Sequence, residues 1–109
     1  MKVEKIIVLG LSPTAKYVVK EAYLLNIKCI AFDFKNGPSK YSRYFEKTEI
    51  ISESELLKKL KRDYLNDGTS YYFCPTSDEW VEFLHKNKIL FKNTNLKTSS
   101  SYLDGSYTL

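Results

Sequence analysis

The chain has 109 residues, of which 43% are hydrophobic and 28% are charged, as expected for a single soluble domain with a hydrophobic core. The net charge is +4, but the 17 Lys and Arg residues are spread among 13 acids without a basic tract, so we expect no nucleic-acid partner. The apolar runs are far shorter than the roughly 20 residues that span a bilayer and the N-terminus lacks a secretory signal, so we expect a cytoplasmic protein without a membrane partner.

The first predicted element is a buried strand over residues 5–9. Its continuous apolar run is typical of a central parallel strand that is covered on both faces. Gly10 permits a tight turn, Ser12 is a good N-cap, and Pro13 occupies the favoured first helical position. A helix is therefore expected from Pro13 to Leu25. Its inward face is predicted to carry Ala15, Val18, Val19, Ala22 and Leu25.

The next segments continue the alternation of strand and helix. A second strand is expected over residues 27–33, and it ends in an acid, Asp33. Residues 34–45 form a long connection, of the kind that is often functional in a small domain. A short third strand over residues 48–51 precedes a helix that is capped by Ser52 or Ser54.

The C-terminal part begins with a fourth strand over residues 71–74. Thr76 or Ser77 then caps a helix with Trp80, Val81 and Leu84 on its packed side. The apolar run at residues 88–91 predicts a short fifth strand. Residues 93–109 are rich in Ser, Thr and Asn and offer no apolar face worth burying.

This order of elements predicts an α/β fold, a Rossmann-like three-layer α/β/α domain with a mostly parallel sheet of 4–5 strands. Ligands of such sheets bind beyond the carboxyl ends of the strands. We therefore expect residues 10–12, Asp33 and residues 75–78 to share one edge of the sheet.

The first turn has two interpretations. Residues 10–15 fit the first glycine and the last small residue of G-x-G-x-x-G/A, but Ser12 replaces the glycine that lets backbone approach a pyrophosphate. Asp33 stands where the ribose-binding acid of a dinucleotide site belongs. The alternative is an ordinary N-capped helix and a strand-terminal acid, and the sequence does not decide between the two.

Other candidate residues also have plain structural alternatives. Arg43 is either a solvated loop residue or a fork for a carboxylate or phosphate. Asp78 either stabilises its helix start or points a carboxylate at the ligand edge. Cys29 and Cys74 have no metal-ligand spacing and are predicted to be buried free thiols, although spacing leaves a disulfide open. No nucleophile elbow, P-loop or zinc pattern occurs.

Four short segments agree in order and spacing with one family. They are residues 8–13 at the first turn, 42–44 before the third strand, 75–78 after the fourth strand and 102–104 near the end. In these segments the chain resembles the N-terminal, pre-ATP-grasp domain of ATP-grasp ligases, in the branch of the carbamoyl-phosphate-synthase-like and carboxylate–amine ligases. The resemblance covers essentially the whole chain.

The resemblance implies a substrate-side domain that is not catalytic alone. Residues 1–93 would form the pre-ATP-grasp domain, and residues 94–109 a linker or the start of a missing ATP-grasp domain. That downstream domain would bind ATP and Mg²⁺, whereas this chain would hold no cofactor or metal. The full enzyme would activate a small-molecule carboxylate as an acyl phosphate. A truncated chain of this kind has an exposed edge that could support a homodimer.

The predicted substrate contacts are Gly10, Leu11, Ser12, Arg43 and Asp78, all expected on the strand-end edge. A second hypothesis is a free-standing Rossmann-like module that binds a nucleotide or other small anion, with Ser12 and Asp33 central. A third, single-stranded nucleic-acid binding through the basic charge and the tyrosines, is not favoured, because most of the tyrosines lie in predicted strands and helices.

Overall fold

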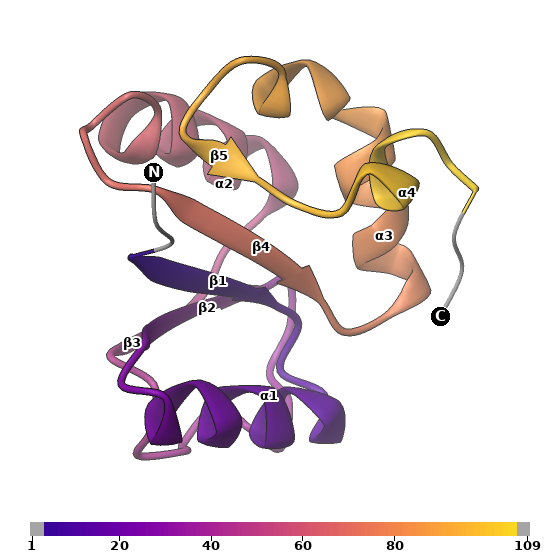
Figure 1. Cartoon of the computed structure of the whole chain (residues 1–109). Coiled ribbons are helices and arrows are strands. Elements are labelled where there is room, and N and C mark those ends of the chain that lie inside the picture. Colours follow the sequence, from indigo (N-terminus) through magenta and orange to yellow (C-terminus); the bar gives the residue numbers. More distant parts are fainter. Residues whose placement is uncertain (1–3, 107–109) are drawn as a thin grey trace.

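The computed structural model describes residues 4–106 and is an α/β fold with one five-stranded, all-parallel sheet (Figure 1). The predicted fold class is therefore confirmed. The elements in chain order are β1 (Lys5–Leu9), α1 (Pro13–Leu24), β2 (Lys28–Asp33), β3 (Lys47–Ile50), α2 (Glu53–Lys59), the π-helix η1 (Leu60–Tyr64), β4 (Tyr71–Pro75), α3 (Asp78–Lys86), the 3-10 helix η2 (Lys88–Phe91), β5 (Leu96–Lys97) and α4 (Ser100–Leu103).

The strand order β3-β2-β1-β4-β5 creates a switch point between β1 and β4. The chain moves outward from β1 through β2 to β3, and then crosses back to β4 on the other side of β1. The register aligns Leu9 with Phe32 and with Pro75, so the three central strands end at the same edge. This edge is where an open parallel sheet binds ligands.

Two hydrophobic layers cover the sheet. On one face, α1 and the segment between β2 and β3 pack on Val8, Cys29 and Ala31. On the other face, α2, η1 and α3 pack on Ile7, Phe32 and Phe73, with Leu56, Leu60, Trp80 and Leu84 fully or almost fully buried. Figure 1 shows α1 alone below the sheet and α2 and α3 above it. Within residues 4–106, no helix combines the length and apolarity needed to cross a bilayer.

Helix α1 ends one residue earlier than predicted. Ala15, Val19 and Ala22 are buried as expected, but Leu25 is the C-cap residue and is 70% exposed, so its predicted inward position is wrong. The predicted stop at Asn26 is confirmed, because this residue has a left-handed φ of 62°. Beyond that residue the chain cannot continue the helical stripe, and Leu25 is left outside it.

The predicted strand at residues 88–91 is wrong, because this run is the 3-10 helix η2. Phe91 packs edge-to-face on Phe73 with ring centroids 5.1 Å apart, while Ile89 is 76% exposed. The fifth strand is instead β5, in which Leu96 is fully buried and pairs with Tyr71. Residues after 93 thus contribute an apolar side chain to the core, contrary to the expectation for this segment.

Candidate functional site

The first turn is built by bonds from both neighbouring strands. The Gly10 N–H donates to the Phe32 carbonyl at 2.8 Å, which ties the turn to β2. Directly after β4, the Thr76 hydroxyl donates to the Leu9 carbonyl at 2.9 Å, as does the Thr76 backbone N–H. The turn after β1 is therefore held by hydrogen bonds to β2 on one side and to the residue after β4 on the other, next to the switch point.

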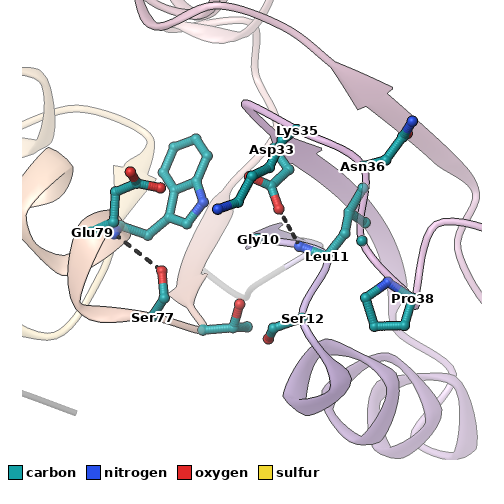
Figure 2. A pocket seen from close by; sticks show the side chains of 12 residues that line it. Gly10, Leu11, Ser12, Asp33, Lys35, Asn36, Pro38, Ser77 and Glu79 are labelled. Carbon is teal, nitrogen blue, oxygen red and sulfur yellow. Dashed lines mark hydrogen bonds between the residues drawn. The ribbon is translucent and has the colours of Figure 1, made fainter.

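A hollow of about 400 Å³ lies at this edge, and we call it the first-turn hollow (Figure 2). It is open toward solvent and lies between the start of α1 and the start of α3. The lining residues are Gly10, Leu11, Ser12, Asp33, Lys35, Asn36, Gly37, Pro38, Thr76, Ser77, Glu79 and Trp80. The prediction that the first turn, Asp33 and the segment after β4 share one edge is confirmed.

Gly10 is required by both conformation and space. Its φ is +106°, which L side chains rarely adopt. A Cβ at this position would lie 2.3 Å from the Thr76 Oγ1 and 3.2 Å from the Trp80 Cδ1. The absence of a side chain at Gly10 is thus what allows the pyrrole edge of Trp80 to approach the turn.

Asp33 holds the turn in place rather than presenting a free carboxylate. It is only 7% exposed. Its Oδ2 accepts the Leu11 N–H at 2.7 Å, and its Oδ1 accepts the Phe34 N–H at 2.6 Å. Its carboxylate is thus engaged by the turn, and its low exposure, more than these two bonds, limits the ribose-binding role considered for Asp33.

Two buried polar atoms at the hollow lack a partner within residues 4–106. They are the Ser12 hydroxyl oxygen and the Trp80 Nε1, and Trp80 is only 1% exposed. Buried hydroxyl and indole N–H groups nearly always find an acceptor, and leaving one unpaired costs roughly 1–3 kcal/mol. Both residues line the first-turn hollow, so the two unpartnered groups belong to the same site.

Ser12 occupies the predicted N-cap position of α1 but does not cap through its side chain. Its backbone is extended, with φ −67° and ψ 168°, and Pro13 follows as predicted. The amide that a capping serine usually engages, here Ala15 N–H, donates to the Ser12 carbonyl at 3.0 Å. The predicted position is confirmed and the predicted side-chain cap is wrong.

The connection after β2 forms the wall of the hollow opposite α3. The Ser39 N–H donates to the Leu11 carbonyl at 3.1 Å, and the Ser39 hydroxyl donates to the Ser12 carbonyl at 2.6 Å. Gly37 lies so close that a Cβ there would be 2.2 Å from the Leu11 carbonyl oxygen. The connection therefore packs closely against the first turn and is hydrogen-bonded to it.

Charges of both signs surround the first-turn hollow. Lys35 is exposed and extends across it, and Glu79 is exposed on the α3 side (Figure 2). Asp33 adds a buried negative charge. The N-terminal ends of α1 and α3 add partial positive charge. The arrangement suits a ligand with a single negative charge better than one with several.

Asp78 begins α3 and is exposed, but it does not line the first-turn hollow. Glu79, the next residue, does, and so does Trp80 one position further. Helical spacing predicted Trp80 only as a core residue, and no pattern predicted Glu79 or Lys35 as site residues. Their position after predicted strand ends was the available signal.

Arg43 lies at the opposite edge of the sheet from the first turn, so its predicted place on the strand-end edge is wrong. It lines a separate hollow of about 270 Å³ with residues 26–29, where β2 begins. The Arg43 guanidinium donates to the Tyr44 hydroxyl at 3.4 Å, a contact that raises the pKa of Arg43 and lowers that of Tyr44. Tyr44 packs on Tyr23 with ring centroids 4.9 Å apart.

A further hollow of about 530 Å³ adjoins the start of α3, and we call it the acidic hollow. Its lining residues are Phe34, Ser52, Glu53, Glu79, Glu82, Phe83 and Lys86. Lys86 pairs with Glu53 at 2.9 Å. Glu79 and Glu82 have no ion-pair partner among the described residues.

Both cysteines are free thiols, as predicted, with Cys29 buried and Cys74 only half-buried. Burial raises the pKa of the Cys29 thiol to about 11, which suppresses its reactive thiolate at neutral pH. No three His, Cys, Asp or Glu side chains of residues 4–106 are grouped as they would be around a metal ion.

Comparison with protein-family profiles and with curated proteins found no match to this sequence.

Proposed function

We propose that the first-turn hollow binds the carboxylate group of a small molecule, and that the chain is the substrate-side N-terminal domain of an ATP-dependent carboxylate ligase. The observation that carries the binding proposal is the pair of unpartnered buried groups, the Ser12 hydroxyl and the Trp80 Nε1–H, at one hollow. A carboxylate oxygen accepts hydrogen bonds from both kinds of donor.

Charge and helix geometry favour a monoanion. Lys35 and the starts of α1 and α3 attract negative charge. Glu79 and the buried Asp33 oppose a ligand with two or more negative charges. A carboxylate is therefore preferred over a phosphate dianion.

A dinucleotide fits this edge less well. Ser12 stands where the dinucleotide motif has a glycine, and the Asp33 carboxylate that would bind the ribose is only 7% exposed. The alternative of a free-standing module for a small anion uses the same hollow and the same Ser12 hydroxyl. It differs only in needing no second domain.

The ligase part of the proposal rests on the sequence resemblance. In that reading the ATP-grasp domain supplies ATP and Mg²⁺ for acyl-phosphate formation, and this chain holds and orients the carboxylate. Sequencing the natural gene beyond codon 109 tests it. An ATP-grasp region there is expected, and a stop codon directly after Leu109 would contradict the ligase assignment.

Thermal unfolding with added hexanoate tests the binding part. Hexanoate should raise the Tm of the wild-type chain, and Ser12→Ala should weaken the apparent affinity roughly tenfold through loss of a hydrogen bond to a charged group. Ser77→Ala is the matched control, since Ser77 lines the same hollow but is not one of its buried groups without a partner, its oxygen accepting the Trp80 backbone N–H. Its hexanoate affinity should be nearly unchanged, and NAD should raise the Tm of neither protein.

An equal loss of hexanoate affinity in both serine variants, or no effect of hexanoate on the wild-type Tm, would contradict carboxylate binding at Ser12. A rise in Tm with NAD would favour a nucleotide site instead.

A further inference from the structure

The first-turn hollow and the acidic hollow adjoin each other at α3. Glu79 lines both of them. Phe34 stacks on Trp80 with ring centroids 4.2 Å apart and an interplanar angle of 21°. Trp80 lines the first-turn hollow and Phe34 the acidic hollow, so this stacked pair forms the partition between them.

The two sides of the partition differ in what they offer a ligand. On the Trp80 side are the two unpartnered donors, Trp80 Nε1 and the Ser12 hydroxyl. On the Phe34 side are Glu79 and Glu82, whose carboxylates have no cationic partner among the described residues, whereas Glu53 is neutralised by Lys86. The donors thus lie only on the Trp80 side, whereas the two unpaired acids extend from Glu79, which both hollows share, to Glu82 in the acidic hollow.

Acidic side chains on an exposed helix are by themselves an ordinary solvated face. Here they adjoin an almost fully buried, unpartnered indole N–H, which requires an acceptor that the protein does not provide. An acceptor group seated at Trp80 would carry the rest of its molecule along the aromatic partition toward Glu79. The two carboxylates near that end of the ligand, Glu79 and Glu82, then favour a ligand that carries a positive charge there.

We propose that the two hollows form one groove for a small zwitterion, a carboxylate that carries a separate ammonium group. The carboxylate accepts from Ser12 and Trp80, the carbon chain lies along Phe34, and the ammonium group lies between Glu79 and Glu82. This inference rests on the proposed carboxylate site and adds the class of its substrate.

Three probes of matched length test the groove: 6-aminohexanoate, hexanoate and hexylamine. Each is titrated at low ionic strength into the full chain, and affinities are measured from backbone amide shifts in NMR spectra. We expect 6-aminohexanoate to bind about threefold to fivefold more tightly than hexanoate, as for a partly exposed ion pair, and hexylamine to bind most weakly.

The matched variants are Glu82→Gln in the acidic hollow and Glu21→Gln on the exposed side of α1, which remove the same charge from two helices. Glu82→Gln should remove most of the preference for 6-aminohexanoate, and Glu21→Gln should retain it. Both substitutions are at exposed positions, and unchanged amide spectra would verify folding.

The outcomes separate this inference from the carboxylate site. Equal binding of hexanoate and 6-aminohexanoate, or a preference that survives Glu82→Gln, would overturn the zwitterion groove and leave the carboxylate site standing. Failure of hexanoate and 6-aminohexanoate alike, or hexylamine binding as tightly as 6-aminohexanoate, would overturn both.

Discussion

The starts of α1 and α3 make an instructive comparison, because both have a serine at the N-cap and both border the first-turn hollow. The Ser77 side chain accepts the Trp80 backbone N–H at 3.4 Å and so stabilises α3. The Ser12 side chain makes no such bond, although its backbone is equally extended. The N-cap serine therefore uses its side chain to cap α3, whereas the N-cap serine of α1 leaves its side chain without a hydrogen-bond partner.

The start of α1 is secured by groups other than its own cap. Asp33 accepts the Leu11 N–H from β2, and Ser39 donates to the Ser12 carbonyl from the following connection. Pro13 at the first helical position removes one of the N–H groups that lack a partner at a helix start. With the turn held from outside, the Ser12 hydroxyl is not needed as a cap, as the proposed ligand contact requires.

Substitution of Asp33 is expected to change the free energy of unfolding most. In Asp33→Ala the buried Leu11 N–H and the Phe34 N–H both lose their acceptor, so the free energy of unfolding should fall by roughly 3–4 kcal/mol. Chemical denaturation measures it. Asp33→Asn, which keeps one acceptor oxygen, should lose less; an equal loss in the two variants would show that the bonds to the turn are not what Asp33 contributes.

Gly10→Ala should have the second-largest effect and lower the free energy of unfolding by roughly 2–3 kcal/mol. The new Cβ meets the Thr76 Oγ1 at a left-handed φ of +106°. Gly68→Ala is the matched control, because Gly68 has a similar φ of +94° but no atom within 4 Å of an added Cβ. It should cost only the backbone strain, and losses of the same size would mean that close packing at Gly10 is unimportant.

Substitutions of the two N-cap serines should then differ in their effect on the free energy of unfolding. Ser77→Ala loses a cap and should lower the unfolding free energy by about 1 kcal/mol. Urea denaturation of the purified variant measures this change. A loss no larger than in Ser12→Ala would remove the distinction between the helix starts.

Ser12→Ala should have the smallest effect on stability, within about 0.5 kcal/mol of wild type, because the hydroxyl it removes is buried without a partner. The same denaturation experiment without ligand checks this. A loss near 1 kcal/mol would indicate that Ser12 caps α1 after all.

Much of this edge could be predicted from sequence because alternating strands and helices force parallel strand ends together. The first turn, Asp33 and the segment after β4 lie together at this edge, as the alternation predicts. The alternation could not place Arg43, since the connection from 34 to 46 has no periodic pattern to say which edge it reaches. The residues 88–91 were misassigned because a four-residue apolar run fits a strand and a buried turn of helix equally well.

Trp80 shows a different limit of sequence reasoning. Helical spacing with Leu84 correctly predicted a buried side chain. Spacing cannot say which edge of the indole faces the turn, and it is the Nε1 edge that approaches Gly10. The position of the Trp80 Nε1–H at the first-turn hollow thus depends on the side-chain rotamer of Trp80 and on the absence of a Cβ at Gly10.

The central claim is that the Ser12 hydroxyl and the Trp80 Nε1–H receive a ligand carboxylate together, and one NMR signal reports on it. The chain has a single tryptophan, so its indole N–H gives one cross-peak in a ¹H–¹⁵N spectrum. Titration with hexanoate should move this peak downfield in a saturable way, in wild type and in Ser77→Ala, and far less in Ser12→Ala at equal hexanoate concentration. An indole peak that stays fixed in the wild-type chain, or that moves equally in Ser12→Ala, would contradict the claim.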